Sequence, residues 1–314
     1  MCYSAMVEED YRSFVRATGA KVDLLEFMRM FGLRASGKPV AVPKAMEAPF
    51  AWPTNDPDER QIHTWIVEHN ERLRLKLFED IAAQELRLAK ATASLEVRET
   101  KKAKDDARIA TKKIADYKGR LEDIDRADLR PRDSRIFPGS YALVMVSEGG
   151  RRVVKPMRYQ CRVAGKPVWY DQKFPGTYNA RRDNLEGFWK GVFGRTHGIV
   201  IMSRFYEHVQ RVDEEGKSRD VVLEFSPRDG GTIYAACLWS HWTDGDDELL
   251  SFALVTDDPP PEVLAAGHDR CIIPIRPENV DAWLNPDPAK LGEQYRILAD
   301  REPHYYEHCV AGER

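Results

Sequence analysis

The sequence lacks the features that mark several common classes of protein. It has no apolar run of membrane-spanning length, and its N-terminal region is studded with charge, so we expect neither a membrane span nor a secretory signal. Its 48 Lys and Arg residues face 51 Asp and Glu residues, giving a net charge of −3. Because the chain has no overall basic character, any binding of nucleic acid must rest on a local patch. The sequence therefore predicts a cytoplasmic protein.

Cysteine is scarce and has no paired spacing. The five cysteines, at positions 2, 161, 237, 271 and 309, form no C-x-x-C motif. An odd number without such spacing argues for a reducing compartment and against a disulfide framework or a zinc knuckle. His304 and His308 have the spacing of two metal ligands on a helix, but no third ligand accompanies them. We therefore predict neither a metal nor a cofactor.

Glycine and proline are absent between Asp58 and Lys118, where Ala, Glu, Lys, Arg and Leu dominate. Apolar residues recur there at steps of three, four and seven, which predicts a long amphipathic helix or a helical hairpin. A hairpin that turns within Ala91–Asp106, where the periodicity fades, would bury its apolar stripe on itself, so we favour the hairpin. Residues 99–126 carry nine Lys or Arg and seven Asp or Glu. This mixture is typical of a solvated coiled-coil face and not of a DNA-binding tail.

The remainder of the chain predicts a single α+β domain. Residues 58–126 are interpreted as an inserted arm, leaving residues 1–57 and 127–314, of a size that suits one domain. Helices are expected at 22–33 and 291–298, and an extended connection at 39–57. Short strands are expected at 141–146, 152–157, 198–202, 221–225, 232–238 and 251–256. Short strands joined by glycine-bearing turns, such as Gly149-Gly150, predict a curved mixed or antiparallel, barrel-like sheet.

One stretch, 178–208, carries the densest set of candidate site residues. It opens with a polar loop containing Asn179, Arg181 and Arg182, continues with apolar residues at helical spacing in 188–193, and then enters the buried strand at 198–202. Glu207 follows at the end of that strand. A carboxylate beside a loop with amide and guanidinium groups could form an acid and an anion holder in one cleft. From these residues alone, a structural salt bridge explains Glu207 at least as well.

Two distant stretches add reactive groups. Removal of Met1, which is usual before a small residue, would leave Cys2 with a free α-amine and a thiol on adjacent carbons. Their ordinary pKa values, near ~8 and ~8.5, make both nucleophiles partly available at neutral pH. The alternative is that Cys2 is a small buried hydrophobe. His268-Asp269-Arg270 forms a polar turn before an apolar strand, although a lone histidine is most often structural.

Taken in order, four motifs resemble the SOS-response-associated peptidase (SRAP) family, whose members shield abasic sites in single-stranded DNA. The motifs are Cys2, Asn179-Ala180-Arg181, Phe205-Tyr206-Glu207 and His268-Asp269-Arg270. The flanking segments 156–159, 234–239, 252–256 and 281–284 are similar to the family pattern as well. The resemblance covers the first few residues and most of 150–285. It implies an SRAP-like fold, with a short helix at 281–284. The long helical insertion at 58–126 is unusual for the family.

The resemblance also implies a mechanism and a set of roles. The amine and thiol of Cys2 would capture the aldehyde of an abasic site as a thiazolidine, with Glu207 as general acid/base. His268 would position or protonate the sugar oxygen, and Asn179 would hold the amine or the ring. The DNA contacts would come from Arg181, Arg270, Arg158 and Arg182 on phosphates and from Trp52 stacking on a base, although core packing is the favoured interpretation of Trp52. The expected partner is single-stranded DNA with abasic sites, which would place the protein at the nucleoid when bound.

Departures from the family pattern leave other functions open. The family usually begins Met-Cys-Gly-Arg, whereas Tyr3 and Ser4 follow the cysteine here, so a glycine beside the nucleophile and an arginine suited to phosphate are both missing. One alternative is a cysteine peptidase, or self-processing of the N-terminus, using Cys2. Another is a non-catalytic scaffold that acts through 58–126. That arm could bind a partner protein, self-associate or close over DNA, and the sequence does not decide among these roles.

Overall fold

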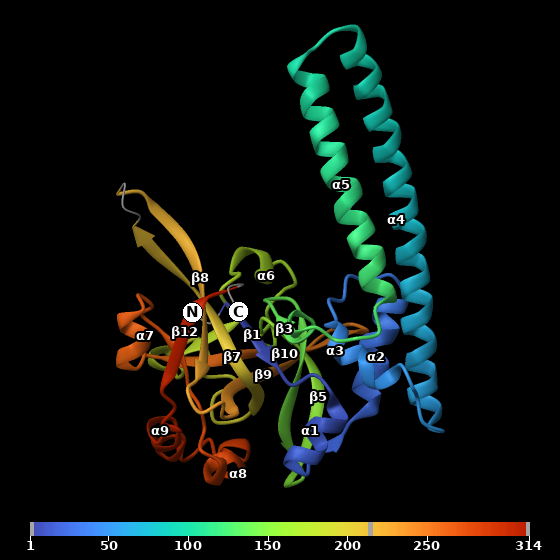
Figure 1. Cartoon of the computed structure of the whole chain (residues 1–314). Coiled ribbons are helices and arrows are strands. Elements are labelled where there is room, and N and C mark those ends of the chain that lie inside the picture. The colour runs from blue at the N-terminus through green and yellow to red at the C-terminus, as the bar shows by residue number, and fades with distance from the viewer. Residues whose placement is uncertain (1–2, 213–215, 312–314) are drawn as a thin grey trace.

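The computed structural model describes residues 3–212 and 216–311 of the chain. It is an α+β protein in which a twelve-stranded sheet forms the body and two long helices rise from one side of it (Figure 1). The N-terminal segment that follows the undescribed residues joins the sheet at once as β1 (Ser4–Val7). Within the described ranges, no helix has both the length and the apolar character needed to cross a membrane.

Five strands close into a barrel. They are β4 (Tyr141–Glu148), β5 (Arg151–Tyr159), β7 (His197–Val212), β9 (Ile233–Asp244) and β10 (Asp247–Asp257). The pairing runs from β4 to β5, β10, β9 and β7, and the ring closes because β7 also pairs with β4. The pairing of β5 with β10 is parallel and the other four are antiparallel, which confirms the expected mixed, barrel-like sheet. The other strands are β2 (Lys21–Val22), β3 (Arg135–Ile136), β6 (Asn179–Arg181), β8 (Ser218–Pro227), β11 (Cys271–Ile272) and β12 (Tyr306–Val310).

Alternation along the strands separates two hydrophobic cores. On β4, Leu143 and Met145 belong to a core shared with the flanking helices, whereas Ala142 and Val144 face the second core on the opposite side of the sheet. Gly198 on β7 faces this second core, where an added Cβ would lie 2.8 Å from Val144 and 2.9 Å from Cys237. The strands therefore approach one another too closely at this point for any larger residue.

Short helices cover the first of these two cores. The helices of the body are α1 (Tyr11–Thr18), α2 (Leu24–Ala35), α3 (Lys44–Glu47), α6 (Tyr170–Lys173), α7 (Pro261–Ala265), α8 (Val280–Leu284) and α9 (Leu291–Ala299). The 3-10 turns are η1 (Ala48–Phe50), η2 (Pro131–Ser134), η3 (Arg182–Asn184) and η4 (Pro277–Asn279). The helices expected at 22–33, 281–284 and 291–298 are confirmed as α2, α8 and α9.

Two local expectations were wrong. The segment 39–57 is not simply extended, because it contains α3 and η1. The apolar residues of 188–193 lie in consecutive turns, and Trp189, Val192 and Phe193 are buried as their spacing suggested. The strand expected at 198–202 continues to Val212 as β7, so Glu207 lies within a strand and not at its end.

The arm is a hairpin of α4 (Pro57–Val97) and α5 (Lys101–Asp125), joined by 98–100 inside the range expected for the turn. Asp56 caps the start of α4, and the Thr100 hydroxyl accepts a hydrogen bond from the Ala103 N–H at the start of α5. The buried or half-buried positions between the helices alternate steps of three and four: Leu77, Ile81, Gln84, Leu88, Ala91 and Leu95 on α4, and Ala103, Ala107, Ala110, Ile114, Tyr117, Leu121 and Ile124 on α5. The division of the chain into residues 58–126 and the remainder stays a prediction.

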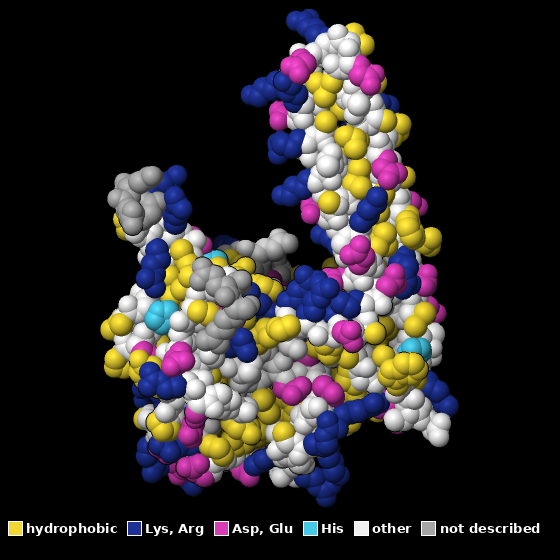
Figure 2. Space-filling model, viewed as in Figure 1, with side chains coloured by type: hydrophobic (Ala, Val, Ile, Leu, Met, Phe, Trp, Pro, Cys, Tyr) yellow, Lys and Arg dark blue, Asp and Glu magenta, His cyan; other side chains and the backbone are white. Residues whose placement is uncertain are grey.

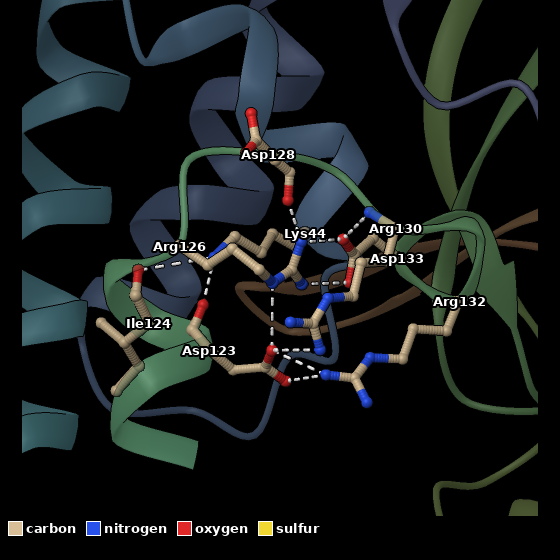
Figure 3. A network of polar contacts seen from close by, with 8 residues as sticks. All are labelled: Lys44, Asp123, Ile124, Arg126, Asp128, Arg130, Arg132 and Asp133. Carbon is tan, nitrogen blue, oxygen red and sulfur yellow. Dashed lines mark hydrogen bonds and ion pairs between the residues drawn. The ribbon is translucent and has the colours of Figure 1, made fainter. Parts of the chain in front are cut away.

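A network of charges attaches the arm to the body (Figure 3). The Lys44 ammonium donates to the backbone carbonyls of Asp123 and Ile124 in the last turn of α5, where carbonyls lack helical partners and a cation is favoured. Arg126 bridges Asp123 and Asp133 across the end of the arm. At the other helix, Trp65 of α4 lies against Gly32 of α2. Both helices of the arm are therefore anchored at the base of the hairpin.

Candidate functional site

A bulge in β7 turns the carboxylate of Glu207 toward the interior. The register with β1 pairs Val7 with Met202 and Met6 with Arg204, so Ser203 is an extra residue on β7. Met202 and the residues Phe205 and Val209 all face the second core. Strict alternation from Met202 would have sent Glu207 to the opposite face. The extra residue at 203 instead aligns Glu207 with Phe205 and Val209, and the Glu207 side chain is fully buried.

Burial and the N-terminal segment both shift the pKa of the Glu207 carboxyl. Burial raises the pKa of the Glu207 carboxyl well above its ordinary value, because a carboxylate loses its hydration in the interior. A hydrogen bond from the Tyr3 backbone N–H opposes this and lowers the pKa in part. The same N–H lies 3.3 Å from the Tyr206 carbonyl oxygen. The residue that follows Cys2 is therefore in direct contact with Glu207, whereas Cys2 itself lies outside the described residues.

His268 completes a buried acid–imidazole pair with Glu207. It follows α7, and its Nε2 lies 3.3 Å from Oε2 of Glu207. Its Nδ1 lies 2.8 Å from the Arg270 carbonyl oxygen, which can only accept, so this contact favours the tautomer with the proton on Nδ1. Burial lowers the pKa of His268, which favours the neutral ring. A protonated Glu207 can then donate to the unprotonated Nε2, and the pair holds one transferable proton.

Charged groups surround the exposed side of this pair. Arg181 on β6 forms a two-point ion pair with Asp183 and is half-exposed. The hydrogen bond between Arg181 and Asp183 is the main influence on the pKa of each. Asp269 also raises the pKa of Arg181, and Arg270 also lowers the pKa of Asp183. These four charged groups therefore lie near one another. The loops at 181–183 and 268–270 therefore lie on the same side of the molecule, although the sequence separates them widely.

Two further predicted residues lie at the edge of this region. Asn179 is buried on β6, whose parallel pairing with β10 places it opposite Leu254 of the second core. Arg182 pairs with Asp257 at 2.9 Å. Asn179 therefore lies on the buried face of the strand that also carries Arg181, while Arg182 is held at the end of β10.

The structure places Arg158 and Trp52 elsewhere. Arg158 pairs with Asp171 at 2.9 Å and donates to the Gln160 carbonyl, and it lines a groove with residues of α2 and with Trp242. Its neighbour Tyr159 faces the second core, so Arg158 points to the opposite side of β5 from that core. Trp52, between η1 and α4, is 86% exposed, so the core packing favoured for it was wrong. Its exposure leaves base stacking as a prediction.

The sequence analysis missed Arg135. This residue of β3 donates to the Ser4 hydroxyl from Nε at 3.1 Å and from Nη2 at 2.9 Å. Its guanidinium also lies over the Tyr206 ring, 3.6 Å from the centroid. It therefore places a cation beside position 4, where the family pattern has an arginine of its own. A single arginine outside the recognised motifs gives no sequence signal for such a contact.

Histidines near the C-terminus do not form the helical pair that their spacing allowed. His308 lies on β12 and His304 precedes that strand. Among the residues that the structure describes, no group of three His, Cys, Asp or Glu side chains could hold a metal ion.

The chain belongs to the SOS response associated peptidase (SRAP) family. The family model matches residues 98–309, which is 212 of 314 residues. The match begins in the turn between the arm helices, so it includes α5 but neither α4 nor the N-terminal motif. Membership associates the chain with the SOS response to DNA damage, in a family linked to DNA–protein crosslinking or peptidase-like activity.

Solved structures from two bacteria are similar to this chain. A protein from Bordetella bronchiseptica is 16% identical with a TM-score of 0.46, covering 59% of this chain and 89% of its own. A protein from Bacteroides thetaiotaomicron is 14% identical with a TM-score of 0.47, covering 57% and 78%. A phage-related protein from Bordetella bronchiseptica is 22% identical with a TM-score of 0.43, covering 57% and 81%. No curated protein matches the chain.

The raised pKa of Glu207 predicts a specific dependence of stability on pH. In the unfolded chain the Glu207 carboxyl has its ordinary pKa near 4.5 and loses its proton above that pH. In the native protein the carboxyl keeps its proton to a higher pH. The stability that this group contributes is therefore complete below the unfolded pKa and is lost as the pH rises through the native pKa. Glu207→Gln, which is neutral throughout, should remove this loss.

Urea unfolding at about pH 5 and about pH 8 measures this effect. The free energy of unfolding of the wild type, minus that of Glu207→Gln, should be smaller at about pH 8 than at about pH 5. Other buried acids, such as Glu9, cancel in this difference. A difference that stays constant with pH would show that Glu207 is ionised in the native protein across this range.

Proposed function

We propose that this protein binds single-stranded DNA and captures abasic sites covalently through Cys2. The observation that carries the proposal is the contact of the Tyr3 backbone with the buried Glu207–His268 pair. Tyr3 is covalently joined to Cys2, so the amine and thiol of a processed N-terminus would be tethered near a proton donor and an imidazole. Tethering of this kind supplies the proximity that a condensation reaction requires.

The chemistry needs an amine, a thiol and a shuttled proton. The Cys2 amine adds to the aldehyde of the ring-opened abasic sugar, and the resulting carbinolamine loses water to give an imine. The Cys2 sulfur then adds to the imine carbon, and the thiol proton passes to the nitrogen as the thiazolidine ring closes. One water is released overall, and no oxidant or reductant is required.

Glu207 is suited to be the acid in these steps. It would protonate the sugar ring oxygen as the aldehyde forms and the hydroxyl group that leaves as water. A carboxyl whose pKa is raised keeps a proton to donate near neutral pH. His268 would accept that proton or hold the sugar oxygen through Nε2, and Asn179 can both donate and accept a hydrogen bond to the amine or the ring.

Cations near the pair would hold the DNA. Arg181 lies near Asp269 and Arg270 lies near Asp183, and Arg135 presents a guanidinium at Ser4. Figure 2 shows Lys and Arg side chains on the surface between the arm and the hairpin of β7 and β8. A planar guanidinium suits the phosphate oxygens, and these positions could follow a strand across the site.

A denaturing gel tests the proposal directly. The purified protein is incubated with single-stranded DNA that carries one abasic site, and with the same DNA lacking the site as a control. We expect a protein–DNA band that survives denaturation and depends on the abasic site. Cleavage of peptide substrates without such a band would support the peptidase instead. If the protein forms no such band and cleaves no peptide, but retains a partner protein through 58–126, the result would support the non-catalytic scaffold.

Arg181→Ala should weaken binding to single-stranded DNA and flatten its salt dependence. Loss of one phosphate contact lowers the slope of log affinity against log salt by about 0.7. Titrations at several salt concentrations measure this slope. Arg228→Ala is the matched control, because Arg228 is also exposed and ion-paired, with Glu307, but lies at the end of β8. Equal slopes for wild type and Arg181→Ala would remove Arg181 from the phosphate contacts.

A further inference from the structure

The helix α4 exposes a continuous apolar stripe. Its large members are Leu75, Phe78, Leu86 and Val97, with exposed fractions of 64%, 57%, 58% and 89%. Exposed alanines fill the positions between them, so the whole stripe is Leu75, Phe78, Ala82, Leu86, Ala89, Ala93 and Val97. Figure 2 shows hydrophobic side chains along the length of the arm. Exposed apolar surface of this extent is typical of an interaction site.

This stripe is not the face that packs on α5. The residues of α4 that lie against α5 include Leu77, Ile81 and Ala91, which are buried. At 3.6 residues per turn, the stripe centred on Ala82 and Leu86 lies on the opposite side of the helix. The hairpin therefore buries one apolar face of α4 against α5, and a second apolar face of α4 remains exposed to solvent.

Opposite charges line the two edges of the stripe. One edge carries Glu71, Glu85 and Glu96, and the other carries Arg72, Lys76 and Lys90. There are two exceptions: Glu79 lies on the basic edge, and Arg74 lies beside the acidic edge, where it pairs with Glu71 of its own helix. In two parallel helices packed face to face, the acidic edge of one lies along the basic edge of the other. In an antiparallel pair like edges would meet, so glutamates would face glutamates. The charge pattern is thus self-complementary in the parallel arrangement alone.

We propose that α4 pairs in parallel with α4 of a second copy of this chain, forming a dimer through the arms. Glu71 would then meet Lys76 of the partner subunit, and Glu85 would meet Lys90 of the partner subunit. Both pairs are five residues apart in the sequence, the offset at which opposite edges of parallel helices meet. Two-fold symmetry makes each pair occur twice.

The repeat of the stripe sets the geometry of the seam. Leu75, Leu86 and Val97 are eleven residues apart, a period close to that of a straight helix, so the two helices can stay in contact without strong coiling. The seam from Leu75 to Val97 is about 33 Å long at 1.5 Å per residue. The body lies to the α5 side of the arm in Figure 1, so the pairing leaves the Glu207–His268 region of both copies accessible.

The mass of the full chain in solution tests the pairing. Light scattering through the micromolar range should give twice the monomer mass of 36.0 kDa, and Phe78→Glu with Leu86→Glu should give the monomer. Leu264→Glu is the matched control, because Leu264 is 59% exposed on α7 of the body. Unchanged helical circular dichroism checks that the arm variant stays folded. A monomeric wild type at every concentration would overturn the proposal.

Two variants test the orientation. Glu85→Lys and Lys90→Glu should each weaken the dimer about tenfold, since each places like charges opposite one another twice, and together they should restore it. Oxidised Ala93→Cys should crosslink two copies near the tip, because equivalent residues face each other in a parallel pair. Dimers that neither respond to the charge reversals nor crosslink through position 93 would overturn the parallel arrangement.

Discussion

Cys2→Ala and Cys2→Ser should both abolish the protein–DNA band that survives denaturation. Cys2→Ala keeps the α-amine, so it can still form an imine, but an imine hydrolyses and leaves no lasting adduct. Cys2→Ser places a hydroxyl where the thiol was, and a neutral hydroxyl is a far weaker nucleophile than a partly ionised thiol. Only the sulfur can close the stable ring. The measurement is the fraction of abasic DNA retained in the shifted band after a fixed time.

Two controls separate the roles of amine and thiol. Cys309→Ala, which removes another cysteine that is not fully buried, should leave the band unchanged. Adding borohydride to Cys2→Ala should restore a band, because reduction traps the imine that the amine forms. Persistence of the full band in Cys2→Ala without reductant would show that another nucleophile carries the reaction.

Glu207→Gln should slow adduct formation by a factor of about 10²–10⁴, the usual contribution of a positioned acid or base. Glutamine has nearly the same shape as the protonated glutamate, but it cannot give up a proton. Binding of the DNA should therefore change little while the chemical step slows. Single-turnover rates of adduct formation, compared with affinities from equilibrium titration, measure the two effects separately.

The pH profile adds a second test of Glu207. The wild-type rate should fall as the pH rises through the raised pKa of this carboxyl, since the acid form is lost, and Glu207→Gln should lack that limb. Glu224→Gln is the matched control. Glu224 is also buried and lies on the neighbouring strand, but it accepts hydrogen bonds from Arg204 and Tyr206 on the other face of β7. Equal losses of binding and rate in Glu207→Gln would argue against an acid role.

The arm and the sheet could be predicted because their signals are local. The absence of glycine and proline from 58–118, with apolar steps of three and four, predicted the hairpin and the range of its turn. Alternating apolar residues and Gly149-Gly150 predicted β4, β5 and their turn, where both glycines adopt positive φ. The strand lengths could not be predicted, because the paired outer ends of β7 and β8, at 210–212 and 218–220, are largely polar and solvent-exposed.

The site was only partly predictable because it depends on contacts between distant segments. The resemblance named Glu207 and His268, but the bulge at Ser203 that turns Glu207 inward has no glycine or proline to signal it. Arg135 reaches Ser4 across the sheet, and nothing in the local sequence marks it. Arg158 was a further phosphate candidate in a segment similar to the family pattern, and its position on the other side of β5, with Asp171, could not be predicted from the sequence.

Mass spectrometry of the digested adduct is the most direct test of whether the processed N-terminus reacts beside Glu207. We expect an N-terminal peptide that begins at Cys2 and carries the abasic fragment, with the combined mass reduced by one water. A peptide that retains Met1, or an adduct on a lysine side chain, would contradict capture by the processed N-terminus.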